Sequence, residues 1–284
     1  MKIAIASGKG GAGKTTVAVN LAYTAPEPVV LLDCDVEEPN CHLFLAPEPD
    51  QREAILQPVP LLDALKCNGC GRCGRICQFH AIAFLGSAPL LYTDMCHSCG
   101  GCTTVCPTGA LREVGQEIGT IETGTMSTGA LVYGRLNVGR AISPPLIRAV
   151  RQRAFEAPLV LVDCPPGTSC PLVAAVEGCD FALLVCEPTP FGVHDLQLVV
   201  DTVRALDIPC GIVVNRGNAD SQLVHAFSRR TGVPVLQEIP EDKDVARAYA
   251  MGQIGSREVP STRAYFESLW KALLALRKPV RKDC

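Results

Sequence analysis

The sequence has no long apolar run and little net charge, and these absences exclude several classes of protein. No apolar stretch reaches the ~18 residues that a transmembrane helix needs. The formal net charge is only −3, which gives no overall attraction to nucleic acid. The first residues lead straight into a strand-like segment, without the basic and apolar regions of a secretory signal. We therefore expect a cytoplasmic protein that binds neither nucleic acid nor membrane.

Cysteine, by contrast, is abundant. The chain has 16 cysteines in 284 residues, and half of them fall between residues 67 and 106. Thiols stay reduced in the cytosol, so a cysteine-rich chain there indicates metal sites rather than disulfides.

The first twenty residues carry a nucleotide-binding signature. A strand-like run, a glycine-rich stretch and a helix-like run follow one another, and Gly8, Gly13, Lys14 and Thr15 match G-x-x-x-x-G-K-[ST]. In such a loop backbone amides bind phosphate oxygens, the lysine reaches the β- and γ-phosphates, and the threonine ligates Mg²⁺. A flexible glycine-rich turn is the alternative, but strand, spacing and helix all agree with the signature. The candidate nucleotide-binding residues of the loop are Gly8, Lys9, Gly10, Gly11, Ala12, Gly13, Lys14, Thr15 and Thr16.

Lys9 narrows the class further. The string GKGGAGKTT resembles the deviant Walker A loop of the MinD/ParA family, which includes nitrogenase iron protein and the Mrp-type iron–sulfur ATPases. The resemblance implies an Mg²⁺-dependent ATPase acting as a homodimer, or as a heterodimer with a related ATPase. Lys9 and Lys14 would both be catalytic, with Lys9 reaching the partner's nucleotide. A solvated loop lysine is the alternative for Lys9.

Two later apolar segments, Pro28–Asp35 and Ala157–Asp163, end in acidic residues. Continuous apolar runs are typical of parallel strands covered on both faces, and ligands bind at the carboxyl ends of such strands. The string DCDVEEPN resembles the family's switch I. It implies that Asp35 positions or deprotonates the attacking water and that Asp33 supports the Mg²⁺ shell, although Asp35 could also be a strand-end cap.

Three further positions take roles from the same resemblance. The string DCPPG resembles the Walker B and switch II segment, so Asp163 would join Thr15 at Mg²⁺ and the Gly167 amide would reach the γ-phosphate. Asn215, at the end of another predicted strand, resembles the adenine-recognising asparagine, with Pro240 on the other side of the base. A turn-forming asparagine is the alternative.

The cysteine-rich segment is an internal repeat of 29 residues. Each half fits C-x₂-C-x₂-C-x₃-C, the pattern of bacterial two-cluster ferredoxins. The two runs are Cys67, Cys70, Cys73 and Cys77, and Cys96, Cys99, Cys102 and Cys106. A zinc site needs only four ligands, whereas the two runs supply two complete sets of four cysteines. A disulfide scaffold conflicts with the cytosolic context, so we favour two [4Fe–4S] clusters.

The ferredoxin resemblance also implies crossed ligands, because the fourth cysteine of each run then ligates the other cluster. The first cluster would be held by Cys67, Cys70, Cys73 and Cys106. The second would be held by Cys96, Cys99, Cys102 and Cys77.

The resemblance covers essentially the whole chain and predicts an α/β fold. We expect a doubly wound, mostly parallel P-loop sheet with an inserted α+β ferredoxin-like domain, divided as 1–60, 61–112 and 113–284. Residues 47–65 look like a proline-rich connector with a short strand, and 144–155 like a helix. The run 265–274 suits a last helix docked on the core better than an amphipathic membrane helix.

The predicted function couples ATP hydrolysis to electron transfer through the two clusters. The partners would be a redox or iron–sulfur client protein, and the cofactors ATP, Mg²⁺ and two [4Fe–4S] clusters. Two alternatives stay open, an iron–sulfur carrier ATPase and a MinD/ParA-type positioning switch with structural clusters. No C-x-x-C pair occurs outside the repeat, which argues against a labile cluster bridging two subunits.

Overall fold

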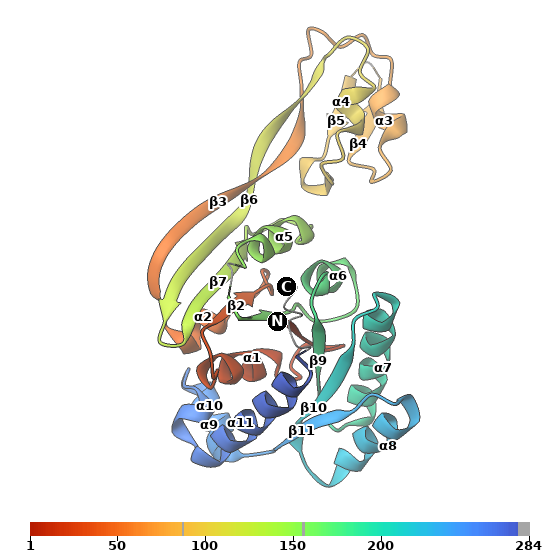
Figure 1. Ribbon diagram of the computed structural model, residues 1–284. Helices are drawn as coiled ribbons and strands as arrows, with labels where there is room; N and C mark the ends of the chain where they lie inside the picture. The colour runs from red at the N-terminus through yellow and green to blue at the C-terminus, as the bar shows by residue number, and fades with distance from the viewer. Residues whose placement is uncertain (87, 155–156, 278–284) are drawn as a thin grey trace, which may run out of the picture.

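The protein is described by a computed structural model for residues 1–86, 88–154 and 157–277. Its body is built on a nine-stranded sheet (Figure 1). In spatial order the strands are β11 (Val235–Pro240), β10 (Cys210–Gly217), β9 (Phe181–Cys186), β1 (Lys2–Ala6), β8 (Leu159–Asp163), β2 (Val29–Asp33), β7 (Gly129–Leu136), β6 (Leu111–Met126) and β3 (Glu48–Leu62). The first seven strands run parallel to one another, β6 runs antiparallel to β7, and β3 runs antiparallel to β6. The expected α/β class with a mostly parallel sheet is confirmed.

Helices cover both faces of this sheet, as the continuous apolar strands require. In β1, Ile3 and Ile5 point to one face and Ala4 and Ala6 to the other. The first face packs against α1 (Lys14–Tyr23) and α11 (Pro260–Ala275). The second packs against α5 (Pro144–Gln152), α6 (Cys170–Val176), α7 (Pro190–Ala205) and α8 (Gln222–Thr231). The short helices α2 (Cys41–Leu45), α9 (Lys243–Ala250) and α10 (Gly255–Glu258) complete the body.

The last helix docks on the core, as its spacing predicts. Phe266, Leu269, Trp270 and Leu273 are buried, and the indole N–H of Trp270 donates to the Leu21 carbonyl at 3.0 Å. In the part of the chain that the structure describes, no helix is both long and apolar enough to cross a membrane. The expected helix 144–155 ends at Gln152. Phe155, the basic residues Lys278, Arg281 and Lys282, and Cys284 lie outside the described residues.

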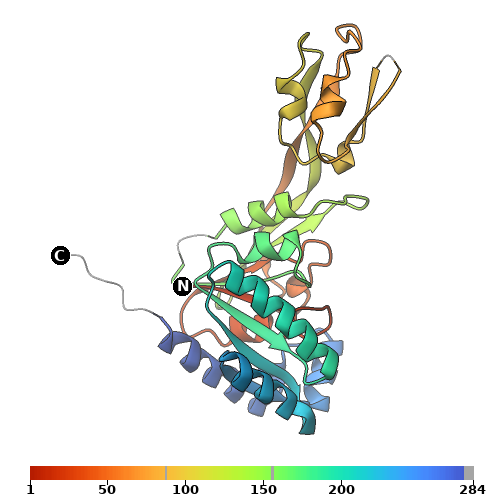
Figure 2. The same cartoon turned by 90° about the vertical axis from the view of Figure 1, so that its right-hand side faces the viewer.

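The expectation of a connector over residues 47–65 is wrong, because that segment is the long strand β3. It pairs with β6 along its whole length and forms the edge of the sheet. An edge strand tolerates proline, which cannot donate to a ladder, and here Pro49 and Pro58 lie opposite Gly124 and Gly115. Together β3 and β6 make a twisted two-stranded ribbon that runs out from the body (Figures 1 and 2).

A small separate unit sits at the far end of this ribbon (Figure 1). This cysteine unit, residues 63–110, contains η1 (Thr93–Met95), α3 (Arg72–Ile76), α4 (Gly101–Thr104) and the hairpin of β4 (Ile82–Leu85) and β5 (Ala88–Leu91). Its small core includes Cys73 and Ile82, which pack with Leu111 at the start of β6.

Polar contacts tie the second cysteine run to the ribbon and the body. The Gln57 side-chain amide donates to the Cys96 carbonyl at 2.6 Å, and the Ser98 hydroxyl donates to the Pro58 carbonyl at 2.6 Å. An ion pair of 2.7 Å joins Arg140, from the loop after β7, to Asp94. The cysteine unit is therefore held against the ribbon and the body by side-chain contacts as well as by its two chain connections.

Candidate nucleotide site and cysteine groups

The glycine loop lies between β1 and α1, at the carboxyl edge of the parallel strands. Two of its glycines are required by close approaches. A Cβ on Gly8 would lie 2.2 Å from the Asp195 carbonyl oxygen, and one on Gly13 would lie 2.1 Å from Asn215 Nδ2. Gly13 also has φ +94°, a left-handed conformation that other residues rarely adopt. Close packing against Asp195 and Asn215 thus holds the loop at Gly8 and Gly13.

Lys14 is almost fully buried, with 6 % of its surface exposed, and it lines the large pocket beside the loop. Its ammonium donates to the Ser7 hydroxyl at 3.1 Å, and that hydroxyl donates to the Lys9 carbonyl at 2.6 Å. The pocket measures about 520 Å³, within the usual range for a small-molecule site. A buried cation in such a pocket favours an anionic ligand.

The expected nucleotide residues divide into two sets. Those that line this pocket are Gly10, Gly11, Gly13, Lys14, Thr15, Thr16, Asp35, Asn215 and Pro240. Those that do not line it are Gly8, Lys9, Ala12, Asp33, Asp163 and Gly167.

Two of the expected acids meet beneath the loop. Asp33 and Asp163 are paired residues of neighbouring strands, both fully buried. The Thr15 hydroxyl donates to Asp163 Oδ2 at 2.8 Å, while Asp163 Oδ1 has no hydrogen-bond partner. Asp33 accepts from the backbone amides of Asn40 and Cys41, each at 3.0 Å.

Burial raises the pKa values of both carboxyls of this pair, and repulsion from Asp33 adds to the rise at Asp163. Burial is the largest cause for both. The Lys14 charge works in the opposite direction on Asp163. A cation bound here would relieve that repulsion, and the unpartnered oxygen of Asp163 and the nearby hydroxyl are hard donors that suit Mg²⁺.

Cys41 joins this acidic pair, which the sequence did not indicate. Its thiol donates to Asp163 Oδ2 at 3.4 Å, and one donor atom from each of the three residues lies within 4.8 Å of the others. Nothing in the sequence around Cys41 resembles a ligand motif, so only the fold could reveal this contact.

Asp35 lies at the pocket side of the same strand end. Burial, followed by repulsion from Asp33, raises the pKa of the Asp35 carboxyl to about 7, against the attraction of Lys14. A carboxyl with that pKa is partly protonated at neutral pH, which suits proton exchange with a water molecule.

This pKa predicts a pH-dependent stability for the protein without nucleotide or metal. Below pH 4 the Asp35 carboxyl is protonated whether the chain is folded or not. Between pH 4 and pH 7 the unfolded chain ionises first, so the wild-type protein loses stability as pH rises. Asp35→Asn removes that loss, and its gain in Tm over wild type should be larger at pH 8 than at pH 5.

Differential scanning fluorimetry with a chelator present measures both Tm values. Asp201→Asn, which removes an exposed carboxylate on α7, is the matched control and should give the same difference at both pH values. A gain for Asp35→Asn that does not grow with pH would contradict the pKa.

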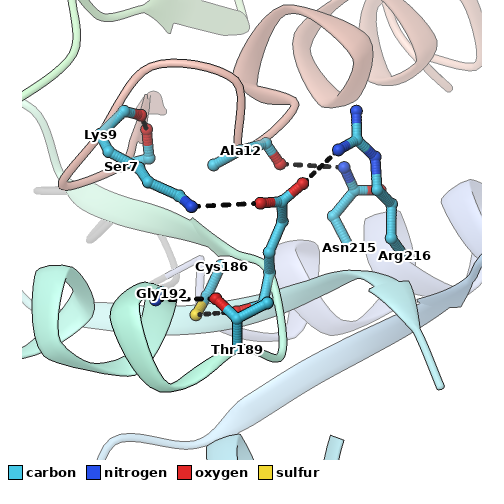
Figure 3. A network of polar contacts seen from close by, with 9 residues as sticks. Ser7, Lys9, Ala12, Cys186, Thr189, Gly192, Asn215 and Arg216 are labelled. Carbon is cyan, nitrogen blue, oxygen red and sulfur yellow. Dashed lines mark hydrogen bonds and ion pairs between the residues drawn. The ribbon is translucent and has the colours of Figure 1, made fainter. Parts of the chain in front are cut away.

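Lys9 does not line the pocket but forms an ion pair with Glu187, 3.3 Å away (Figure 3). Glu187 follows β9 directly and also pairs with Arg216. Neither Glu187 nor Arg216 was expected at this site from the sequence. Glu187 could have been noticed as an acid immediately after a predicted parallel strand, at the same sheet edge as the loop.

Asn215 and Gly167 are each engaged with the glycine loop. The Asn215 side-chain amide donates to the Ala12 carbonyl at 2.9 Å (Figure 3), and the Gly167 amide donates to the Ser7 carbonyl at 3.2 Å. Gly167 has φ +90° and open space where a side chain would be, so its peptide has room to turn. For Gly167 to donate to a phosphate, its bond to Ser7 must first break.

The eight cysteines of the repeat come together as two mixed groups. The first cysteine group, whose members line one cavity, is Cys67, Cys70, Cys73 and Cys106. Burial is the largest cause that raises the pKa of Cys96, and the nearby thiols Cys99 and Cys77 add to it. The pKa of Cys102 is likewise raised, first by burial and then also by Cys96 and Cys99. We call Cys96, Cys99, Cys102 and Cys77 the second cysteine group.

Backbone amides point at some of these sulfurs. The Ser98 amide donates to Cys96 Sγ at 3.4 Å. Burial slightly opposes ionisation of Cys106, but hydrogen bonds from the Leu111, Thr108 and Ala110 amides and the Thr108 hydroxyl outweigh it and lower its pKa. Amides that stabilise thiolates are the surroundings that iron–sulfur ligands need.

Comparisons with known proteins agree with the body of the fold. The family described as "CobQ/CobB/MinD/ParA nucleotide binding domain" matches residues 3–254. An uncharacterized protein of Methanocaldococcus jannaschii is 32% identical over 95% of this chain and 96% of its own. The septum site-determining protein MinD of Pyrococcus horikoshii, solved with Mg-ADP, is similar in fold with a TM-score of 0.61 and 19% identity, covering 96% of each chain. The MinD cell-division ATPase of Pyrococcus furiosus gives 0.60 and 20% over 97% of this chain and 99% of its own.

Proposed function

This chain belongs to the CobQ/CobB/MinD/ParA family of nucleotide-binding domains, and from that premise we propose that its ATPase cycle controls two [4Fe–4S] clusters in the cysteine unit. The class of MinD/ParA-like ATPase follows from the family and from the fold of its solved relatives. The proposal adds the clusters, their redox role and the residues that serve each site.

Four residues would serve the phosphates and the metal. Lys14 supplies a buried positive charge, and Thr15, Asp33 and Asp163 form the hard-donor set beneath it. Mg²⁺, when bound, would neutralise charge on the β- and γ-phosphates. The amides of Gly8 to Thr16 would cradle the phosphate oxygens.

Asp35 would orient the attacking water and accept its proton. Its raised pKa supports that role, because a base with a pKa near the working pH takes up a proton most effectively. The Gly167 amide would respond to the presence of the γ-phosphate by exchanging its hydrogen bond to the Ser7 carbonyl for one to the nucleotide. Asn215 and Pro240, both lining the pocket, would flank the adenine.

Lys9 would act on a second ATPase chain. It is held by Glu187 within its own chain, so reaching a partner's nucleotide means leaving this ion pair. The pair is partly exposed and therefore weak, so dimer contacts can replace it.

Two observations support iron–sulfur clusters over zinc. The groups mix cysteines from the two runs, the arrangement that the ferredoxin pattern implies. Among the residues that the structure describes, no three thiols lie within 4.8 Å of one another, whereas tetrahedral zinc at ~2.3 Å from each sulfur brings them to about 3.8 Å. When bound, each cluster would supply a one-electron centre.

The observation that carries the coupling is the continuous hydrogen-bonded connection from the acids to the cysteines. Asp33 ends β2, which pairs with β7, and β7 pairs with β6, a strand of the ribbon. The switch residue Val36 accepts from the Leu136 amide at the end of β7, at 2.8 Å. The ribbon then contacts Cys96 through Gln57. Along this connection a rearrangement at switch I would reach the second cysteine group.

Nucleotide should therefore shift a cluster potential. Allosteric couplings are ~1–3 kcal/mol, which corresponds to roughly 40–130 mV for one electron. We expect ATP with Mg²⁺, compared with ADP, to shift at least one cluster by such an amount, and we expect Asp35→Ala to keep the shift while blocking turnover. EPR-monitored redox titration of anaerobically purified protein measures it, and Lys14→Ala, which should not bind nucleotide, is the control.

The competing functions give different results. The comparisons by themselves fit a MinD/ParA-type switch better than electron transfer, since the two solved relatives described above are MinD proteins. Identical potentials without nucleotide, with ADP and with trapped ATP would favour that switch, with structural clusters. Ready loss of both clusters to an acceptor apo-protein would favour a carrier.

A further inference from the structure

The cysteine unit carries a shallow groove between α3 and α4. The two helices lie side by side in both views (Figures 1 and 2). The groove measures about 460 Å³ and is lined by Arg72, Arg75, Ile76, Thr104, Val105, Cys106 and Pro107. No residue of the ATPase body lines it, so it stays open to a partner while the second cysteine run rests on the ribbon.

The charge of the groove is positive and unbalanced. The two acidic residues of the cysteine unit, Asp63 and Asp94, do not line the groove. Each forms an ion pair elsewhere, Asp63 with Lys66 and Asp94 with Arg140. Among the described residues the Arg72 side chain makes no hydrogen bond or ion pair, and the Arg75 side chain makes one hydrogen bond, to the Cys70 carbonyl at 3.2 Å. Two arginines are thus available to carboxylates in a chain whose net charge is negative.

The rest of the groove is apolar and reaches a cluster ligand. Ile76 is 44% exposed, and Val105 and Pro107 lie beside it. Cys106 lines both this groove and the cavity of the first cysteine group. A cationic rim around a small apolar centre is a surface that steers and seats an oppositely charged protein.

We propose that this groove docks an acidic one-electron carrier protein, with its carboxylates on Arg72 and Arg75 and its redox centre beside Cys106. The inference rests on the proposed iron–sulfur function. One electron leaves the reduced carrier, which is oxidised by one electron, and the cluster of the first cysteine group is reduced by one. No bond or proton is exchanged.

An acidic flavodoxin is the probe, and binding is measured before electron transfer. Titrating oxidised flavodoxin with the whole protein, followed by flavin fluorescence at low salt, gives Kd. Arg72→Glu should weaken binding at least tenfold and Arg72→Gln by less, and raising the salt should weaken wild-type binding. Arg229→Glu makes the same charge change on exposed α8 and should leave Kd unchanged.

Stopped-flow bleaching of cluster absorbance by reduced flavodoxin is the second readout. Arg72→Glu should slow it at least tenfold, while iron content and the amplitude of dithionite reduction stay at wild-type values. Equal Kd and equal rates in Arg72→Glu and wild type would overturn the docking site and leave the iron–sulfur function standing. No reaction between wild-type protein and flavodoxin, with clusters that dithionite reduces, would also overturn it. Absence of clusters would instead refute the proposed function, and the docking site with it.

Discussion

Lys14→Ala should abolish ATP hydrolysis, with a loss of about 10³-fold or more, and leave the iron content unchanged. The ammonium is buried in the pocket and the Ser7 hydroxyl is its hydrogen-bond partner. Phosphoryl transfer depends on charge placed in advance at the phosphates, where single electrostatic groups contribute ~10²–10³-fold and the P-loop lysine also holds the ligand. The cysteine unit is a separate body at the end of the ribbon, so its iron should not respond.

A phosphate-release assay and an iron determination on the same preparation measure both quantities. Lys243→Ala is the matched control, because Lys243 is an exposed lysine on the rim of the same pocket. It should change the KM for ATP by no more than a few fold. Parallel loss of iron in Lys14→Ala would show that the two sites are not independent.

Cys77→Ser should damage the cluster of the second cysteine group, although Cys77 belongs to the first run in sequence. Its thiol raises the pKa of Cys96, as a near neighbour does. Loss of one cluster should lower the iron content by about half, since the two [4Fe–4S] clusters hold the same number of iron atoms. EPR of the reduced protein should retain the signal of the cluster held by Cys73 and Cys106.

Cys210→Ser is the control for the loss of any one thiol, because Cys210 lies on β10 in the body. It should leave both clusters intact. If Cys77→Ser removed the signal of the first group alone, each run would hold its own cluster and the crossed arrangement would be refuted.

The sequence predicted those parts of the molecule whose local residue pattern is enough to determine their place in the fold. The predicted apolar segments Pro28–Asp35 and Ala157–Asp163 contain β2 and β8, because short buried apolar runs have few alternatives in an α/β protein. Asp33 and Asp163 were correctly expected to meet, since the carboxyl ends of parallel strands share one edge of the sheet. Only a short strand was expected where the long strand β3 lies, because the first half of this edge strand is exposed, its residues show neither an apolar run nor an alternating pattern, and its prolines resemble a linker.

Side-chain contacts between residues far apart in the sequence could not be predicted from local sequence patterns. Lys9 and Glu187 are 178 positions apart in the chain, and Cys41 reaches Asp163 only because α2 begins directly beneath the sheet edge. Neither contact leaves a local signature. The hydrogen bond between Gln57 and Cys96 also has no local signature, because it joins the long strand β3 to the second cysteine run.

The ribbon also has a mechanical consequence. Only Gly119–Met126 of β6 pair with β7, and Ile118 is buried in the core, so the seven residues from Leu111 to Glu117 extend past β7 with β3 as their sole strand partner. At ~3.4 Å per residue they form a lever arm of roughly 24 Å, and once the Arg140–Asp94 ion pair opened, a tilt of about 10° at its base would displace its tip by roughly 4 Å. Electron tunnelling weakens steeply with distance, so such a swing would act as a gate, opening or closing the gap between a cluster and its acceptor without changing the chemistry of either.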